Sequence, residues 1–243
     1  MFLSSLIFQT ACTLFPRRTY FASYYKPEFE CSREAKWKNE KDFEKYMQGW
    51  QYLRSLYNTQ NMSISKAKNV IAGNSLVQLF SEDLIRKEFP NTEIVNRGIG
   101  GDSTFTFLLR LEDNVLSLNP SVIFLEIGGN DLIQEKCLEV IEENVKEIVR
   151  RIKAHNPKTK IVFLSVPPTT RPELNSIVPV YNAFLIGLAN SIEGVYYLDT
   201  WKYFRAKNAP TIKEEYIRPK DAIHFSEKGY EVWGQLMRPY IAK

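Results

Sequence analysis

From residue 69 onward, short apolar runs alternate regularly with helical patterns, and this alternation is the strongest constraint on the fold. The runs are rich in β-branched and aromatic residues, as is typical of strands buried on both faces. Strands that alternate with helices favour parallel pairing through right-handed crossovers. We therefore predict an α/β fold, a three-layer α/β/α sandwich around a five-stranded parallel sheet. The predicted strands are 69–73, 93–99, 121–128, 160–166 and 195–199, and the predicted helices lie near 76–89, 103–117, 134–155, 173–192 and 226–241.

The first 27 residues differ from this pattern. Residues 1–27 contain no Asp or Glu, and residues 2–15 are mostly apolar and are followed by Pro-Arg-Arg. An apolar run of this length is too short for a typical membrane span but is compatible with a leader or an N-terminal anchor. We expect such a segment at 1–27, with membrane association through residues 1–15. Export or membrane tethering is favoured over a cytoplasmic location.

A helical pattern also precedes the alternating region. Between residues 33 and 58, apolar side chains recur at spacings of three and four, with charged residues on the other face. This spacing predicts an amphipathic helix that packs on the main domain. Residues 28–68 are therefore expected to be a helical extension and linker, and residues 69–243 the main domain.

Composition excludes several classes of function. The formal net charge is only +4, which gives no support for nucleic-acid binding. The three cysteines, Cys12, Cys31 and Cys137, have neither the spacing of a zinc site nor that of a disulfide framework. Cys137 falls on an apolar helical face and is expected to be a buried thiol. The sequence does not predict an oligomeric state.

Chemically distinctive residues gather where three of the predicted strands end. Ser75, Gly101 and Asn130 follow the first, second and third strands in glycine-containing loops. In open parallel sheets, ligands bind beyond the carboxyl ends of the strands. A serine hydroxyl needs an adjacent base to become a nucleophile. His224 is the better of two histidines, because His155 falls at a solvated helix end.

A base in turn needs a partner, and Asp221 lies three residues before His224, close enough to orient its imidazole. Each element also has a purely structural interpretation. Ser75 can be an N-cap, Asn130 can cap a helix, and the Asp-x-x-His pair can be an ordinary loop contact. The combination favours a serine hydrolase.

Four blocks in order carry a resemblance to a known superfamily. They are Ile71-Ala72-Gly73-Asn74-Ser75-Leu76, Asn96 to Thr104 (NRGIGGDST), Gly128-Gly129-Asn130-Asp131 and Asp221-Ala222-Ile223-His224. They resemble the SGNH (GDSL-type) hydrolases, whose fold is flavodoxin-like, and are most similar to the branch of platelet-activating-factor acetylhydrolases. The resemblance implies a serine esterase for short acyl, acetyl-type esters. It assigns catalysis to Ser75, His224 and Asp221, the oxyanion hole to Ser75, Gly101 and Asn130, and requires no cofactor and no metal.

One position departs from the family pattern, because Asn74 stands where the family usually has Asp. Asn74 is not the triad acid, so we expect catalysis to survive, with a changed pH dependence. Two alternatives stay open. One is a non-catalytic module on the same fold that binds glycan or protein. The other is a nucleotide or phosphate binder that uses residues 73–75 as an anion loop at a helix N-terminus.

Overall fold

Five parallel strands form the centre of the molecule, in the order β2-β1-β3-β4-β5. The structure is a computed structural model that describes residues 23–64 and 66–242. The strands are β1 (Asn69–Gly73), β2 (Val95–Gly98), β3 (Val122–Glu126), β4 (Lys160–Leu164) and β5 (Val195–Leu198). All five predicted strands are confirmed. The register places Gly73 beside both Gly98 and Glu126, so that β1, β2 and β3 end at the same edge of the sheet.

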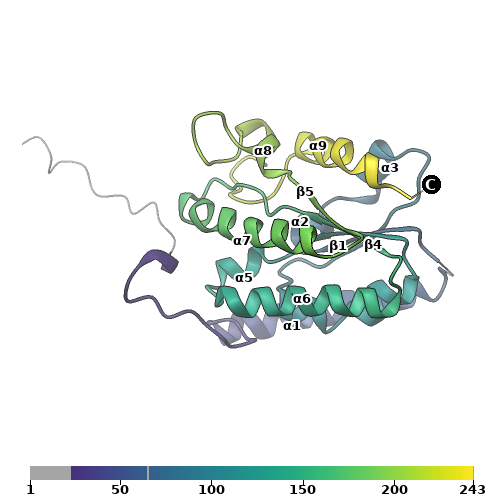
Figure 1. Ribbon diagram of the computed structural model, residues 1–243, viewed down its shortest axis with the longest axis horizontal. Coiled ribbons are helices and arrows are strands. Elements are labelled where there is room, and N and C mark those ends of the chain that lie inside the picture. The colour runs from purple at the N-terminus through teal and green to yellow at the C-terminus, as the bar shows by residue number, and fades with distance from the viewer. Residues whose placement is uncertain (1–22, 65, 243) are drawn as a thin grey trace, which may run out of the picture.

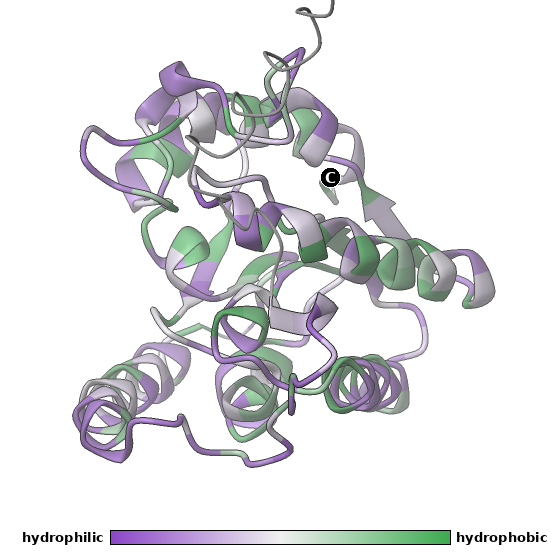
Figure 2. Ribbon diagram, turned by 90° about the vertical axis from the view of Figure 1, so that its left-hand side faces the viewer, coloured by the Kyte–Doolittle hydropathy of each residue, from purple (hydrophilic) through white to green (hydrophobic). Residues whose placement is uncertain are grey.

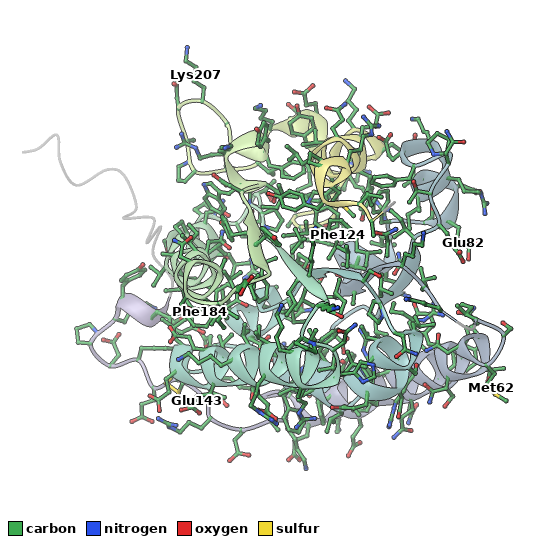
Figure 3. The ribbon with its side chains drawn as sticks, turned by 45° about the vertical axis from the view of Figure 1, so that its right-hand side comes forward. Met62, Glu82, Phe124, Glu143, Phe184 and Lys207 are labelled. Atoms are coloured by element: carbon green, nitrogen blue, oxygen red, sulfur yellow. A yellow bond between two sulfur atoms is a disulfide. The ribbon has the colours of Figure 1, made fainter. Side chains whose placement is uncertain are left out.

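Helices cover both faces of the sheet, as the layered fold predicts (Figure 1). One core contains Val70 and Leu125 of the strands together with α6 (Leu138–His155) and α7 (Pro172–Ser191). The opposite core contains Phe124, which lies at the centre of the molecule in Figure 3. It also contains side chains of α2 (Ser75–Gln78), α3 (Glu82–Glu88) and α9 (Glu227–Met237). Figure 2 shows hydrophobic colour in the sheet and hydrophilic colour on the outer loops. The three-layer sandwich is confirmed.

Several predicted helices are divided in the structure. The 76–89 region forms α2 (Ser75–Gln78) and α3 (Glu82–Glu88), because the Ser81 hydroxyl caps a new helix. The 103–117 region forms α4 (Thr104–Leu108) followed by a π-helical turn and a 3₁₀ turn. α5 (Gly129–Ile133) precedes α6, and α9 (Glu227–Met237) follows the short α8 (Trp201–Phe204). Apolar periodicity does not show these breaks, since the separated pieces bury side chains in the same layer.

The expected N-terminal helix is α1 (Glu40–Asn61). It begins later than the predicted residue 33 because Asn39 caps its first turn, accepting a hydrogen bond from the Asp42 N–H. Trp50 of α1 is buried, and Asn61 donates hydrogen bonds to the Asp113 and Asn114 carbonyls, so α1 packs on the main domain.

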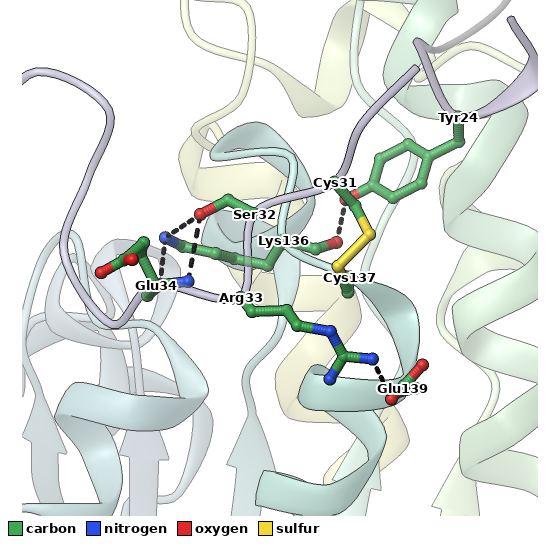
Figure 4. The surroundings of a disulfide bond; sticks show 8 residues. All are labelled: Tyr24, Cys31, Ser32, Arg33, Glu34, Lys136, Cys137 and Glu139. Atoms are coloured by element: carbon green, nitrogen blue, oxygen red, sulfur yellow. Dashed lines mark hydrogen bonds and ion pairs between the residues drawn. A yellow bond between two sulfur atoms is a disulfide. The ribbon is translucent and has the colours of Figure 1, made fainter. Parts of the chain in front are cut away.

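The segment before α1 is fixed by a disulfide bond, which the sequence analysis did not predict. Cys31 and Cys137 are bonded with their Cα atoms 4.8 Å apart (Figure 4). The prediction of a buried free thiol at Cys137 was therefore wrong. The Ser32 N–H donates to the Glu135 carbonyl and the Cys137 N–H to the Ser32 carbonyl, which brings the two cysteines together. Sequence spacing carries no signal for such a contact.

Replacing both cysteines by serine (Cys31→Ser with Cys137→Ser) is expected to lower the free energy of unfolding by about 2–4 kcal/mol. The cysteines are 106 residues apart, so the cross-link removes a large loop entropy from the unfolded chain. Urea unfolding measures the change, and a reductant should destabilise the wild type but leave the double variant unchanged. Equal unfolding midpoints for the two proteins would contradict the expectation.

Some predictions fall outside the described residues. The leader or anchor at 1–27, the membrane association through 1–15, and Cys12 lie wholly or mostly in residues 1–22. Within 23–64 and 66–242, no helix has the length and apolar character needed to cross a membrane.

Candidate active site

Three of the predicted site residues form a hydrogen-bonded chain at the carboxyl edge of the sheet. Ser75 is the first residue of α2, directly after β1, and Asp221 and His224 lie in the loop before α9. His224 Nε2 lies 2.9 Å from Ser75 Oγ, and His224 Nδ1 lies 2.8 Å from Asp221 Oδ2. The side chains of His224 and Asp221 are each 28% exposed, so the chain is accessible from solvent.

The loop holds Asp221 in its ionised form. Burial raises the pKa of Asp221. Hydrogen bonds from the N–H groups of His224 and Ile223 and from the His224 ring outweigh this effect and lower the pKa to about 2. Both N–H groups donate to Oδ1, at 3.0 and 2.8 Å, which leaves Oδ2 for the imidazole. A carboxylate fixed in this way can select the imidazole tautomer that carries its proton on Nδ1.

The residue before Ser75 caps the helix, and Ser75 does not. Asn74 Oδ1 accepts a hydrogen bond of 2.9 Å from the Leu76 N–H. An amide oxygen caps a helix about as well as a carboxylate oxygen does, which explains how Asn can stand where Asp is usual. The interpretation of Ser75 as the N-cap is therefore wrong, and its hydroxyl is free to bond to His224.

Gly101 and Asn130 lie close together, as predicted. The Asn130 side-chain amide donates a 2.9 Å hydrogen bond to the Asp102 carbonyl, in the residue next to Gly101. An amide group carries two hydrogens, so one remains for another acceptor. The Ser75 N–H, in the first turn of α2, has no partner within its helix. No acceptor among the described residues bonds to the Gly101 N–H.

The loop at Gly101 has a conformation that requires glycine. Gly101 has φ of +84°, and an added Cβ would lie 2.7 Å from the ring of Tyr46 on α1. Tyr46 in turn stacks on Trp37, with ring centroids 4.6 Å apart. The N-terminal extension therefore packs directly against this loop.

Asp102 is the residue of the site whose importance the sequence analysis missed. Its fully buried carboxylate pairs with Arg110 through Nε at 2.7 Å and Nη2 at 2.5 Å. It also accepts hydrogen bonds from Trp50 and Tyr46 of α1 and from Thr106. Burial raises the pKa of Asp102, and the Arg110 guanidinium offsets this rise only in part. The only sequence signal was its place after Gly101.

A small cavity opens beside Ser75. It has a volume of about 30 Å³, and Asn74, Ser75 and Asn130 contribute to its wall. The rest of the wall is mostly apolar, with Val166, Pro167, Leu174, Val178 and Ile223 among its residues. Glu126, the last residue of β3, also lines it. The sequence analysis assigned no role to Glu126, although an acid inside a buried apolar run was a signal.

The second histidine lies away from this site. His155 lies exposed at the end of α6, where its Nε2 is 3.0 Å from Asn119 Oδ1, as the sequence predicts for a surface residue. Within the described ranges, no three His, Cys, Asp or Glu side chains are grouped to hold a metal ion.

The chain is similar to several known proteins. Human platelet-activating factor acetylhydrolase IB subunit alpha2 is 33% identical over 101 residues, which is 41% of this chain and 43% of the relative. The chain thus matches less than half the length of that relative.

Two solved structures share the fold. One from Streptococcus pneumonia, named for platelet activating factor, aligns with a TM-score of 0.73 and 22% identity, covering 81% of this chain and 94% of its own. An acetylxylan esterase from Geobacillus stearothermophilus aligns with a TM-score of 0.58 and 15% identity, covering 74% and 95%. Residues 63–232 match the GDSL-like Lipase/Acylhydrolase family. This match spans most of the chain and all four sequence blocks, and the protein therefore belongs to the GDSL-like lipase/acylhydrolase family.

Proposed function

We propose that the protein is a serine esterase that hydrolyses short acyl, acetyl-type esters with Ser75 as nucleophile. The observation that carries the proposal is the continuous hydrogen-bonded chain from Ser75 Oγ through His224 to Asp221, with links of 2.9 and 2.8 Å. Such a chain supplies the adjacent base and the orienting acid that a serine nucleophile needs.

The reaction proceeds in two acyl-transfer steps. Ser75 Oγ attacks the ester carbonyl carbon while His224 Nε2 takes the hydroxyl proton. The tetrahedral intermediate collapses, His224 returns the proton to the leaving alcohol, and the acyl group stays on Ser75. His224 then takes a proton from water, whose oxygen attacks the acyl carbon and releases the acid. Asp221 stabilises the imidazolium in both steps.

Three donors are proposed to bind the oxyanion. They are the N–H groups of Ser75 and Gly101 and the second hydrogen of the Asn130 amide. The bond from Asn130 to the Asp102 carbonyl supports this role, because it fixes the amide before substrate binds. Donors that are already oriented stabilise developing charge without the cost of reorganisation.

The preference for short acyl groups rests on the cavity beside Ser75. Its small volume, about 30 Å³, supports a preference for an acetyl-sized group over a fatty acyl chain. The names of a relative and of a structural neighbour, platelet-activating factor acetylhydrolase and acetylxylan esterase, both refer to acetyl groups and support the same choice.

The test is a series of p-nitrophenyl esters from acetate to octanoate, together with acetylated xylan, assayed with the wild type and with Ser75→Ala. We expect hydrolysis of acetate with kcat/KM falling as the acyl chain lengthens, and no activity above background in Ser75→Ala. A fluorophosphonate probe should label the wild type at Ser75. A folded protein that hydrolyses no ester and takes no label would instead favour the non-catalytic binding module.

Asn130→Ala is expected to lower kcat by roughly 10²- to 10³-fold with little change in KM. The reason is that the lost hydrogen bond forms only with the charged oxygen of the transition state. Steady-state kinetics on p-nitrophenyl acetate measure the effect. Asn119→Ala, which removes an amide from the distant contact with His155, is the matched control and should retain wild-type kinetics. Equal losses in the two variants would argue against an oxyanion role for Asn130.

We also propose that the protein functions in an oxidising compartment, in agreement with an exported or membrane-tethered location. The Cys31–Cys137 disulfide supports this, since such bonds persist mainly outside reducing compartments. Acid trapping of the native protein from its source, followed by maleimide labelling, should modify Cys31 and Cys137 only after reduction. Labelling of both without reduction would reject the proposal.

A further inference from the structure

A buried carboxyl group lies in the wall of the cavity beside Ser75, and the mechanism above does not use it. Glu126 ends β3, an otherwise apolar strand, and its side chain is fully buried. The sheet register pairs Glu126 with Gly73, two residues before Ser75. Glu126 therefore contributes to the cavity wall next to the loop that carries the nucleophile.

The Glu126 carboxyl lacks partners for both of its oxygens. Neither oxygen makes a hydrogen bond among the described residues. The Asn74 amide is near enough to interact with the carboxyl group, but without standard hydrogen-bond geometry. A buried polar group without a partner is costly, so its retention calls for a ligand or a water molecule that satisfies it.

The surroundings favour the neutral acid. Burial raises the pKa of Glu126 to about 8, and the Asn74 amide lowers it only in part. The titratable groups that interact electrostatically with it are the buried phenols of Tyr181 on α7 and Tyr230 on α9. No cation among the described residues pairs with it. At neutral pH, Glu126 therefore offers one O–H donor and one carbonyl acceptor to the cavity.

The position of Glu126 in the cavity indicates what it contacts. Ser75 and Asn130 border the cavity where the reacting carbonyl must lie, and Val166, Leu174 and Val178 give it an apolar wall. A volume of about 30 Å³ leaves room for only one or two small groups beyond the carbonyl carbon. A plain alkyl group of that size would leave Glu126 unsatisfied, whereas a hydroxyl group would both donate to it and accept from it.

We propose that Glu126 makes the acyl pocket selective for short acyl groups that carry a hydroxyl group, such as glycolyl and lactyl, over alkyl groups of the same size. This inference rests on the proposed esterase function and specifies its acyl substrate.

The test compares pairs of esters that differ only by hydroxyl against methyl. Phenyl glycolate is compared with phenyl propionate, and phenyl lactate with phenyl isobutyrate. Each kcat/KM is divided by the rate constant for alkaline hydrolysis of the same ester, which removes the intrinsic reactivity of the acyl group. The proteins are the full chain, Glu126→Gln, which keeps an acceptor oxygen and has an NH2 donor group, and Glu126→Leu, which has neither.

We expect the corrected hydroxyl-to-methyl ratio of the wild type to exceed that of Glu126→Leu by about 10- to 100-fold, and Glu126→Gln to stay within about threefold of the wild type. Both esters of a pair are assayed on the same sample, so partial unfolding cancels in the ratio. If Glu126→Leu does not fold, the wild-type ratio decides, and a corrected ratio near one overturns the proposal. Equal ratios in the wild type and Glu126→Leu, with acetate still hydrolysed, also overturn it, whereas failure to hydrolyse any ester rejects the esterase function itself.

Discussion

Ser75→Ala is expected to lower kcat on p-nitrophenyl acetate by roughly 10⁴- to 10⁶-fold, to the level left by substrate binding and the oxyanion donors alone. The hydroxyl is the atom that forms the bond to the acyl carbon. His224, 2.9 Å away, has no other nucleophile among its hydrogen-bond partners. The fold should be unaffected, because Asn74 caps α2 and the Ser75 side chain stabilises no helix terminus.

Ser81→Ala is the matched control, since Ser81 is an exposed serine at the start of the next helix and its hydroxyl is the N-cap of α3. The two substitutions should have opposite profiles. Ser81→Ala should cost about 1 kcal/mol of stability and keep its activity, whereas Ser75→Ala should keep its melting temperature and lose its activity. Substantial ester hydrolysis by Ser75→Ala, after background subtraction, would reject the assignment of the nucleophile.

The strands and the position of the site were predictable because both depend on patterns that are local in sequence. A strand covered by helices on both faces must be almost continuously apolar, and β1, β3 and β4 are. The carboxyl ends of parallel strands lie at one edge of the sheet, so the loops that follow them are close in space even when they are far apart in sequence. This geometry made it possible to group Ser75, Gly101 and Asn130 without knowing the structure.

The contacts that the sequence did not predict join segments far apart along the chain. Tyr46 and Trp50 were expected only as apolar residues of an amphipathic helix, but their polar atoms bond to Asp102, more than 50 residues away. The Cys31–Cys137 disulfide is a similar case, because only the path of the folded segment brings the two thiols together. Neither contact leaves a periodic signal in the sequence.

Asp102→Asn is expected to destabilise the protein by about 3–5 kcal/mol, the largest stability effect proposed, because it leaves the Arg110 charge buried without a counter-ion. Both side chains are 0% exposed, so water cannot replace the lost carboxylate. The amide NH2 group would also replace one of the two acceptor oxygens, so its hydrogens would face the donors of either Arg110 or Trp50. Chemical denaturation measures the change, with Asp113→Asn as the control. Asp113 pairs with Arg54 at 2.5 Å, but that pair is exposed and should contribute less than about 1 kcal/mol.

A second variant separates the buried charge from the other contacts of Asp102. Arg110→Met in the Asp102→Asn background removes the unpaired cation, so the double variant should regain part of the stability lost in Asp102→Asn. Arg110 also donates to the Gly73 carbonyl, which limits the recovery. A loss below about 1 kcal/mol in Asp102→Asn would show that the pair does not hold the loop. No recovery in the double variant would assign the loss instead to the hydrogen bonds from α1. Recovery in the double variant would show that the Gly101 loop is stabilised by residues that do no chemistry themselves, because Asp102 contacts α1 and the amide of Asn130 while Arg110 contacts the end of β1.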